Sequence, residues 1–164
     1  ASYNPSISGG ASGTAGNSTE LGYSATYTGV DGLSLSYGVT DLDSAGTATD
    51  GDQTAWKASY AYGPITVAAT NSEYDVTGTA SDQEVSSYKL SYAVSDAISI
   101  GYGSESISTS TTGELDAEYK GLNASYTAGG MTISAAMQDG SEIAHSTAVA
   151  EDVEFWSLGL SFAF

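Results

Sequence analysis

The chain alternates apolar and polar residues with a period of two over most of its length. That period is the period of a β-strand, in which successive side chains point to opposite faces of a sheet. No stretch shows a convincing period of 3.6, which is typical of an amphipathic helix. The alternation predicts ten strands, at about residues 3–9, 19–29, 33–41, 53–62, 65–74, 84–94, 98–107, 115–128, 131–139 and 152–164.

The two faces of the predicted strands differ in character. The segment 33–40 illustrates the contrast, with Leu33, Leu35, Tyr37 and Val39 alternating with Ser34, Ser36, Gly38 and Thr40. A soluble β-sandwich also alternates, but its two faces do not separate so cleanly into large apolar and small polar residues. The pattern favours a transmembrane barrel, in which the apolar face meets lipid and the small polar face lines a watery lumen.

The connections between the predicted strands alternate in length. Short turns at 30–32, 63–64, 95–97 and 129–130 separate long, polar loops at 10–18, 42–52, 75–83, 108–114 and 140–151. Short turns at one rim and long loops at the other are typical of a barrel meander. The predicted fold is therefore all-β, an antiparallel up-and-down transmembrane β-barrel of about ten strands, with residues 1–164 in a single domain.

Composition narrows the functional classes. The chain has 164 residues, 20 Asp and Glu against three Lys and no Arg, and a formal net charge of -17. A chain this acidic lacks the basic face needed to bind nucleic acid. It also has no Cys, which excludes disulfides and thiolate metal sites. No apolar run reaches the length of a membrane-spanning helix.

The last eight residues carry the most specific motif. Residues 157–164 follow the pattern polar-x-Gly-x-x-aromatic-x-aromatic, through Ser157, Gly159, Phe162 and Phe164. This pattern resembles the C-terminal assembly signal of bacterial outer-membrane β-barrels. The resemblance implies that the barrel-assembly machinery reads this strand and that Phe164 lies at the periplasmic rim.

Three further segments resemble porins of Gram-negative bacteria, most closely those of marine alphaproteobacteria. They are YTGVDGLSLSY at 27–37, SYAYGPITV at 59–67 and SYTAGGM at 125–131. The resemblance implies a sixteen-stranded, homotrimeric barrel in the outer membrane, surrounded by lipid and lipopolysaccharide. Ten strands are then the C-terminal portion of such a barrel, and a complete ten-stranded barrel is the alternative.

Aromatic residues gather near the short turns on the predicted outer face. They are Tyr27, Tyr60, Tyr62, Tyr92 and Tyr126, together with Phe162 and Phe164. Aromatic rings at this depth form the girdle that marks the interface between lipid and water.

Two lysines are predicted to face the lumen. Lys57 and Lys89 each lie between two outward residues, and each precedes the last outward residue of its strand, Tyr62 or Val94, by five positions. They are two strands apart, or about 10 Å at sheet spacing. Such cations attract anionic solutes. Alternatively, they are solvated lumen residues or pair with a carboxylate such as Glu105.

The third lysine does not fit the outward pattern. Counting back from Tyr126 places Lys120 on the lipid-facing side. There it would extend to the interface to reach lipid phosphates. A bulge near Gly121 would instead turn it inward, and the sequence leaves both readings open.

Acidic residues crowd the predicted loops. They are Asp41, Asp43, Asp50, Asp52, Asp75, Asp82, Glu114, Asp116, Glu118, Asp139, Glu142, Glu151 and Asp152. Oxygen ligands suit weak binding of Ca²⁺ or Mg²⁺, but the spacing lacks the pattern of an EF-hand loop. A solvated acidic rim is the favoured interpretation, and no cofactor is predicted.

The predicted function is that of a porin, a water-filled channel for passive diffusion of small hydrophilic solutes and ions. It requires no enzymatic chemistry. Three alternatives stay open: a small barrel acting as an anchor or adhesin through its acidic loops, a barrel hydrolase that uses His145, and a soluble extracellular β protein of a surface layer or fibre.

Overall fold

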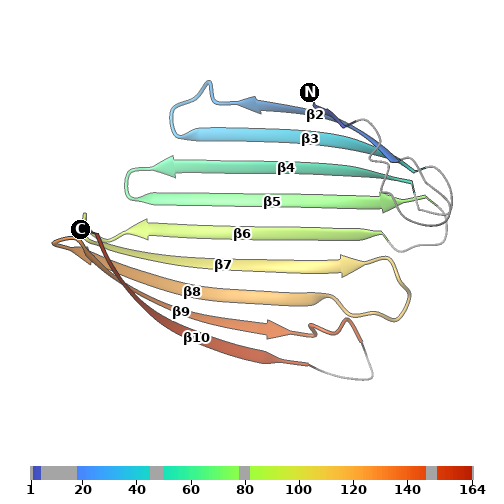
Figure 1. The fold of residues 1–164 in the computed structure, drawn as a ribbon. Helices are drawn as coiled ribbons and strands as arrows, with labels where there is room; N and C mark the ends of the chain where they lie inside the picture. Colours follow the sequence, from blue (N-terminus) through green and yellow to red (C-terminus); the bar gives the residue numbers. More distant parts are fainter. Residues whose placement is uncertain (1, 5–17, 45–49, 78–81, 147–150, 164) are drawn as a thin grey trace.

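A computed structural model describes residues 2–4, 18–44, 50–77, 82–146 and 151–163. These residues form one sheet of ten strands, with no helix among them (Figure 1). The strands are β1 (Ser2–Asn4), β2 (Ser18–Tyr27), β3 (Leu33–Ser44), β4 (Gly51–Tyr62), β5 (Ile65–Val76), β6 (Gln83–Ala93), β7 (Ile98–Thr109), β8 (Ala117–Ala128), β9 (Met131–Ser141) and β10 (Val153–Phe162).

The sheet is an up-and-down meander. Its strand order follows the sequence from β1 to β10, and every neighbouring pair is antiparallel. The nine strands β2 to β10 have 10 to 12 residues each, whereas β1 has three. The predicted all-β, antiparallel meander is confirmed. β1 and β10 are the two ends of the sheet, which is not closed.

The connections alternate in length as predicted. At one end of the sheet they are residues 28–32, 63–64, 94–97 and 129–130, and at the other end they include 45–50, 77–82, 110–116 and 142–152. Two of the short turns are tight hairpins. Gly63 has a φ of 55° before Pro64, and Gly129 and Gly130 have φ values of 58° and 80°. Primed turns of this kind match the right-handed twist of the strands they join.

The described residues form a single layer without a hydrophobic core. Among the described residues, Ala117 is the one buried hydrophobic residue, and large side chains such as Trp156 and Leu158 are 77% and 70% exposed. No described strand packs as a second layer against either face of the sheet (Figure 1). Exposure on this scale is unusual for a soluble domain, because large apolar patches mark surfaces that meet a partner or a membrane.

The register gathers the apolar positions onto one face. Residues paired across antiparallel strands share a face, so the pairing can be followed from strand to strand. One unbroken row crosses eight strands and consists of Leu33, Tyr60, Val67, Leu90, Tyr102, Leu122, Met137 and Trp156. The predicted alternation therefore yields one apolar face and one face that is small and polar on the part nearer the short turns.

The short turns are displaced by a regular step along the sheet. Leu33, the first residue of β3, pairs with Tyr60 of β4. Because β4 continues to Tyr62 before it turns, this turn lies two residues further in the direction of the short turns than Leu33 does. Ile98 lies two residues beyond that turn, and Ala128 lies two residues beyond Ile98. The long-loop ends of the strands step in the same direction. Through the register, Val76, the end of β5, is level with Leu42, two residues before the end of β3 at Ser44. Thr109, the end of β7, is level with Tyr74, two residues before the end of β5.

This step defines a strand inclination. Two residues advance about 7 Å along a strand, while two strands span about 10 Å across the sheet. If the turns lie at one level, the strands incline by about 35° to the normal of that level, which is within the range of closed barrels.

Candidate functional site

The turn-proximal aromatic residues lie on the apolar face, as predicted. Tyr62, Tyr60, Tyr92 and Tyr126 occupy the first or second outward position from the short-turn end of their strands. The rings of Tyr60 and Tyr62 are stacked, with centroids 6.5 Å apart and an interplanar angle of 13°. Because the turns step along the sheet, these rings follow the same step and form one band near the short turns.

A second aromatic band lies on the same face toward the long loops. Its members are Tyr23, Tyr37, Trp56, Tyr88, Tyr102 and Trp156, all exposed. Aliphatic residues such as Val67, Leu90 and Ile100 lie between the two bands. The sequence analysis named the turn-side band alone. The sequence feature that could have predicted the second band is an aromatic residue at the third or fourth outward position from the short turn in six of the strands.

Toward the short turns, the opposite face is built from small residues, many of them with hydroxyl groups, whereas toward the long loops it also carries Tyr74, Tyr119 and Phe155. Pairs of the hydroxyl-bearing side chains hydrogen bond across neighbouring strands, so each hydroxyl group in a pair has a partner within the protein. The pairs are Thr26 with Ser36 at 3.0 Å, Thr70 with Ser87 at 2.6 Å, Ser99 with Ser125 at 2.8 Å and Thr127 with Thr132 at 2.9 Å. This face is suited to contact with water.

Lys57 and Lys89 both lie on the polar face. Lys57 shares a row with Thr70, Ser87 and Glu105, whereas Lys89 lies two residues nearer the short turns, opposite Gly103. That offset equals the step between successive hairpins, so both lysines lie equally far from the turns of their own strands. Glu105 is a diagonal neighbour of Lys89, at a Cα separation of about 7–8 Å for such pairs.

Lys120 lies on the apolar face. β8 pairs without interruption with both β7 and β9 through Gly121, so no bulge turns the lysine inward. Its Nζ donates to Glu118 Oε2 at 2.8 Å, with both side chains about half exposed, and it lies opposite Asp139. The charged group marks the loop-side margin of the apolar band, where a charge costs far less than at mid-depth.

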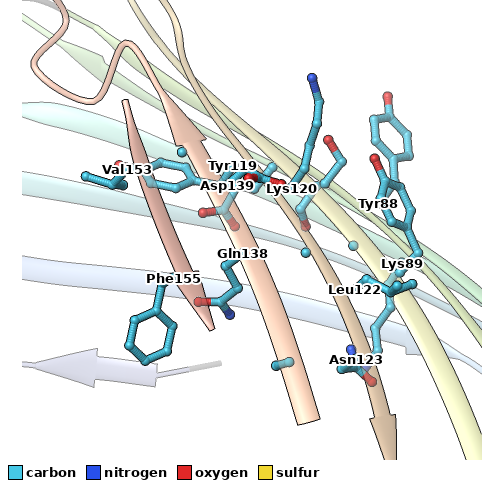
Figure 2. A pocket seen from close by; sticks show the side chains of 18 residues that line it. Tyr88, Lys89, Tyr119, Lys120, Leu122, Asn123, Gln138, Asp139, Val153 and Phe155 are labelled. Carbon is cyan, nitrogen blue, oxygen red and sulfur yellow. The ribbon is translucent and has the colours of Figure 1, made fainter. Parts of the chain in front are cut away.

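A hollow of about 590 Å³ surrounds the pair Gly103 and Gly121 (Figure 2). Two paired glycines leave the sheet no thicker than its backbone at this point, and the lining includes residues of both faces. Figure 2 shows Lys89 and Gln138 on one side of the sheet and Lys120 on the other.

The terminal motif is divided between the two faces. Ser157 and Gly159 lie on the polar face, opposite Ala136 and Ser134, and Phe162 lies on the apolar face, opposite Met131. A Cβ at Gly159 would lie 2.7 Å from Ser134 Oγ, so the glycine gives that hydroxyl its space. Phe164 lies outside the described residues.

The loops show no group of metal ligands in the described part of the chain. No three His, Asp or Glu side chains there are close enough to hold a metal ion. His145 Nδ1 lies 2.9 Å from the backbone oxygen of Leu115. The described residues also contain no helix long and apolar enough to span a membrane.

Comparison with known proteins assigns the chain to no family. The sequence matches no family model and no curated protein.

Proposed function

We propose that this chain forms the wall of an outer-membrane β-barrel whose lumen passes small hydrophilic solutes and ions by passive diffusion. The observation that carries the proposal is the stepped, two-faced single layer. Its apolar face bears aromatic residues near the short turns, as the interface girdle of a membrane barrel does. Its polar face is small and hydroxyl-rich, which leaves room for a column of water.

Strand length supports the same proposal. A tilted transmembrane strand needs about 9–11 residues. Strands β2 to β10 have 10 to 12. An inclination of about 35°, inferred from the step of the turns, accounts for this length.

Closure of the barrel is part of the proposal. Backbone groups on an open edge have no hydrogen-bond partners in lipid, so a wall in a membrane keeps no free edge. β10 presents such an edge over ten residues. In the proposed barrel both edges are paired. The resemblance to porins suggests sixteen strands, a homotrimer and insertion by the barrel-assembly machinery into the outer membrane of a Gram-negative bacterium.

The proposal is tested by reconstitution. The purified protein is added to planar bilayers and to liposomes, and we expect stepwise conductance and an influx of small sugars. A protein that inserts without conductance supports the anchor or adhesin instead. A protein that stays monodisperse without detergent contradicts a membrane location altogether.

A further inference from the structure

The two faces of the sheet exchange their character toward the long loops. Seven to nine residues from the short-turn end of the strand, the polar face carries a large apolar side chain on each of six strands. These side chains form the mouth belt, which consists of Leu42, Tyr74, Val85, Ile107, Tyr119 and Phe155. Because the short turns step along the sheet, equal distances from the turns correspond to one level, and the mouth belt follows that level from β3 to β10.

At the same level the opposite, apolar face is acidic. Its residues eight or nine positions from the short-turn end include Asp41, Glu73, Glu84, Asp139 and Glu154. Carboxylates are costly in hydrocarbon, so in the proposed wall this level lies beyond the lipid. No described strand packs on the mouth belt either. An exposed apolar surface that neither lipid nor a second layer covers is a surface that can bind a ligand.

The aromatic rings of the mouth belt meet a floor of bare backbone. Tyr119 and Phe155 line the hollow around Gly103 and Gly121 (Figure 2). Tyr119 is 37% exposed and Phe155 is 58% exposed. A Cβ at Gly140 would lie 3.2 Å from Tyr119 Cδ1 and 3.1 Å from Ile143 Cγ2, so the Tyr119 ring and Ile143 share the space over Gly140. That contact positions one edge of the ring, and the glycines beside it leave room for a bound molecule.

A carboxylate stands next to the Tyr119 ring. Glu105 pairs directly with Tyr119 across β7 and β8, and both side chains belong to the polar face. Glu105 is exposed, and its carboxylate has no hydrogen bond or ion pair with any described residue. Side chains that face each other in this way have Cβ atoms about 4.5–5.5 Å apart, so a cation held by the carboxylate also meets the ring. Aromatic rings attract cations.

We propose that the mouth belt binds organic cations that carry an apolar group, of the quaternary ammonium type. The cationic head contacts the Glu105 carboxylate and the Tyr119 ring, and the apolar group lies along the belt toward Phe155. The formal net charge of -17 attracts such cations and repels anions of the same shape. Lys89 lies one row nearer the short turns, opposite Gly103, so the site is on the loop side of this lysine. For its role in transport, the site rests on the proposed function.

The site is tested by equilibrium dialysis of benzyltrimethylammonium against the full chain in detergent, without reference to conduction. We expect this cation to bind about tenfold more tightly than tetramethylammonium, because burial of about 55 Å² of its phenyl ring has an effect of that size. Benzenesulfonate, which has a similar size and the opposite charge, should not bind. Raising the salt concentration from about 0.1 M to about 1 M should weaken binding of the cation, since it screens the attraction.

Substitutions locate the site on the polar face. Tyr119→Ser should weaken benzyltrimethylammonium binding about fivefold to tenfold, whereas Tyr119→Phe should bind like the wild type, because the ring makes the contact. Glu105→Gln should weaken the binding of both cations. The matched control is Tyr102→Ser, which removes the same side chain from the opposite face of the neighbouring strand and should leave binding unchanged. Equal binding by the wild type, Tyr119→Ser and Glu105→Gln overturns the site.

Planar bilayers separate this site from the proposed pore. Benzyltrimethylammonium should reduce the single-channel current of the wild type at a lower concentration than it reduces the current of Tyr119→Ser. Equal block of the two conducting proteins overturns the site and leaves the pore. A protein that does not conduct overturns the pore, and cation binding that Tyr119→Ser weakens and Tyr102→Ser does not still supports the site.

Discussion

At the scale of single residues, the register separates three lysines with the same side chain into two environments. Lys57 and Lys89 lie on the small polar face, and Lys120 lies on the apolar face beside Glu118. Counting by twos along the sequence predicted the faces of Lys57 and Lys89 and placed Lys120 on the lipid-facing side. The sequence did not decide the face of Lys120, because one extra residue in a bulge would have turned the side chain to the other face. The uninterrupted pairing of β8 with β7 and β9 excludes such a bulge.

The two polar-face lysines are expected to set ion preference. Replacing both Lys57 and Lys89 with Gln should shift selectivity toward cations, because the chain has 20 acidic residues and no Arg to compensate. The measurement is the reversal potential across a salt gradient. The shift should shrink as salt rises, since the Debye length falls from about 10 Å at 0.1 M to about 3 Å at 1 M.

Lys120→Gln provides the matched control for that measurement. It removes one charge of the same kind from the opposite face and should leave the reversal potential unchanged. Equal potentials for the wild type and the double Lys→Gln variant at low salt would contradict a lumen position for Lys57 and Lys89.

At the scale of elements, the alternation predicted the strands better at their turn ends than at their loop ends. β3, β5 and β7 each continue two or three residues beyond the predicted limit, to Ser44, Val76 and Thr109. At these ends the polarity of the two faces is reversed, because Asp41 and Asp75 lie on the apolar face whereas Leu42 and Val76 lie on the other. The pattern there no longer continues that of the rest of the strand, although the backbone pairing goes on. The contacts of Ile143 with Gly140 and of His145 with Leu115 were equally hidden, because they join residues that the alternation does not relate.

The two ends of the strands should lie on opposite sides of the membrane. Cysteines introduced at Thr112 and Ala144, in the long loops, should react with an impermeant thiol reagent on intact cells. Cysteines at Asp31 and Asp96, in the short turns, should react after the outer membrane is opened. All four residues are exposed, so exposure alone does not separate the two pairs. Labelling of Asp31→Cys on intact cells would contradict the topology.

The terminal strand should matter more for assembly than for stability. Deleting Phe164 removes the last residue of the motif that resembles an assembly signal, and we expect less protein in the outer membrane. Phe155→Ala, in the same strand but outside the motif, is the control and should insert normally. Normal insertion of the Phe164 deletion, measured by membrane fractionation, would argue against the signal.

At the scale of the whole molecule, the absence of a second layer is the property that the sequence predicted most directly. Two faces of different character, each continuous over eight or more strands, leave no place for a core in the described residues. Closure and strand number could not be predicted in the same way, because they depend on the partner of β10. The inclination could be found once the register was known, since it follows from the step of the turns.

The inclination is itself a prediction. Polarised infrared spectroscopy on aligned membranes should give a strand tilt of about 35–45° for the reconstituted protein. Strands lying in the membrane plane, or strands without preferred orientation, would show that the step in the register does not reflect a barrel.

The central claim, that one face meets lipid and the other meets water, is tested most directly by spin-label accessibility along adjacent positions. Cysteines are introduced singly at Leu90, Leu122 and Ile133 on the apolar face, and at Ser91, Asn123 and Ser134 on the polar face. In reconstituted membranes, the first set should be accessible to oxygen, which concentrates in lipid, and the second to a water-soluble nickel complex. A reversed pattern, or equal access to the nickel complex at all six positions, would contradict the account.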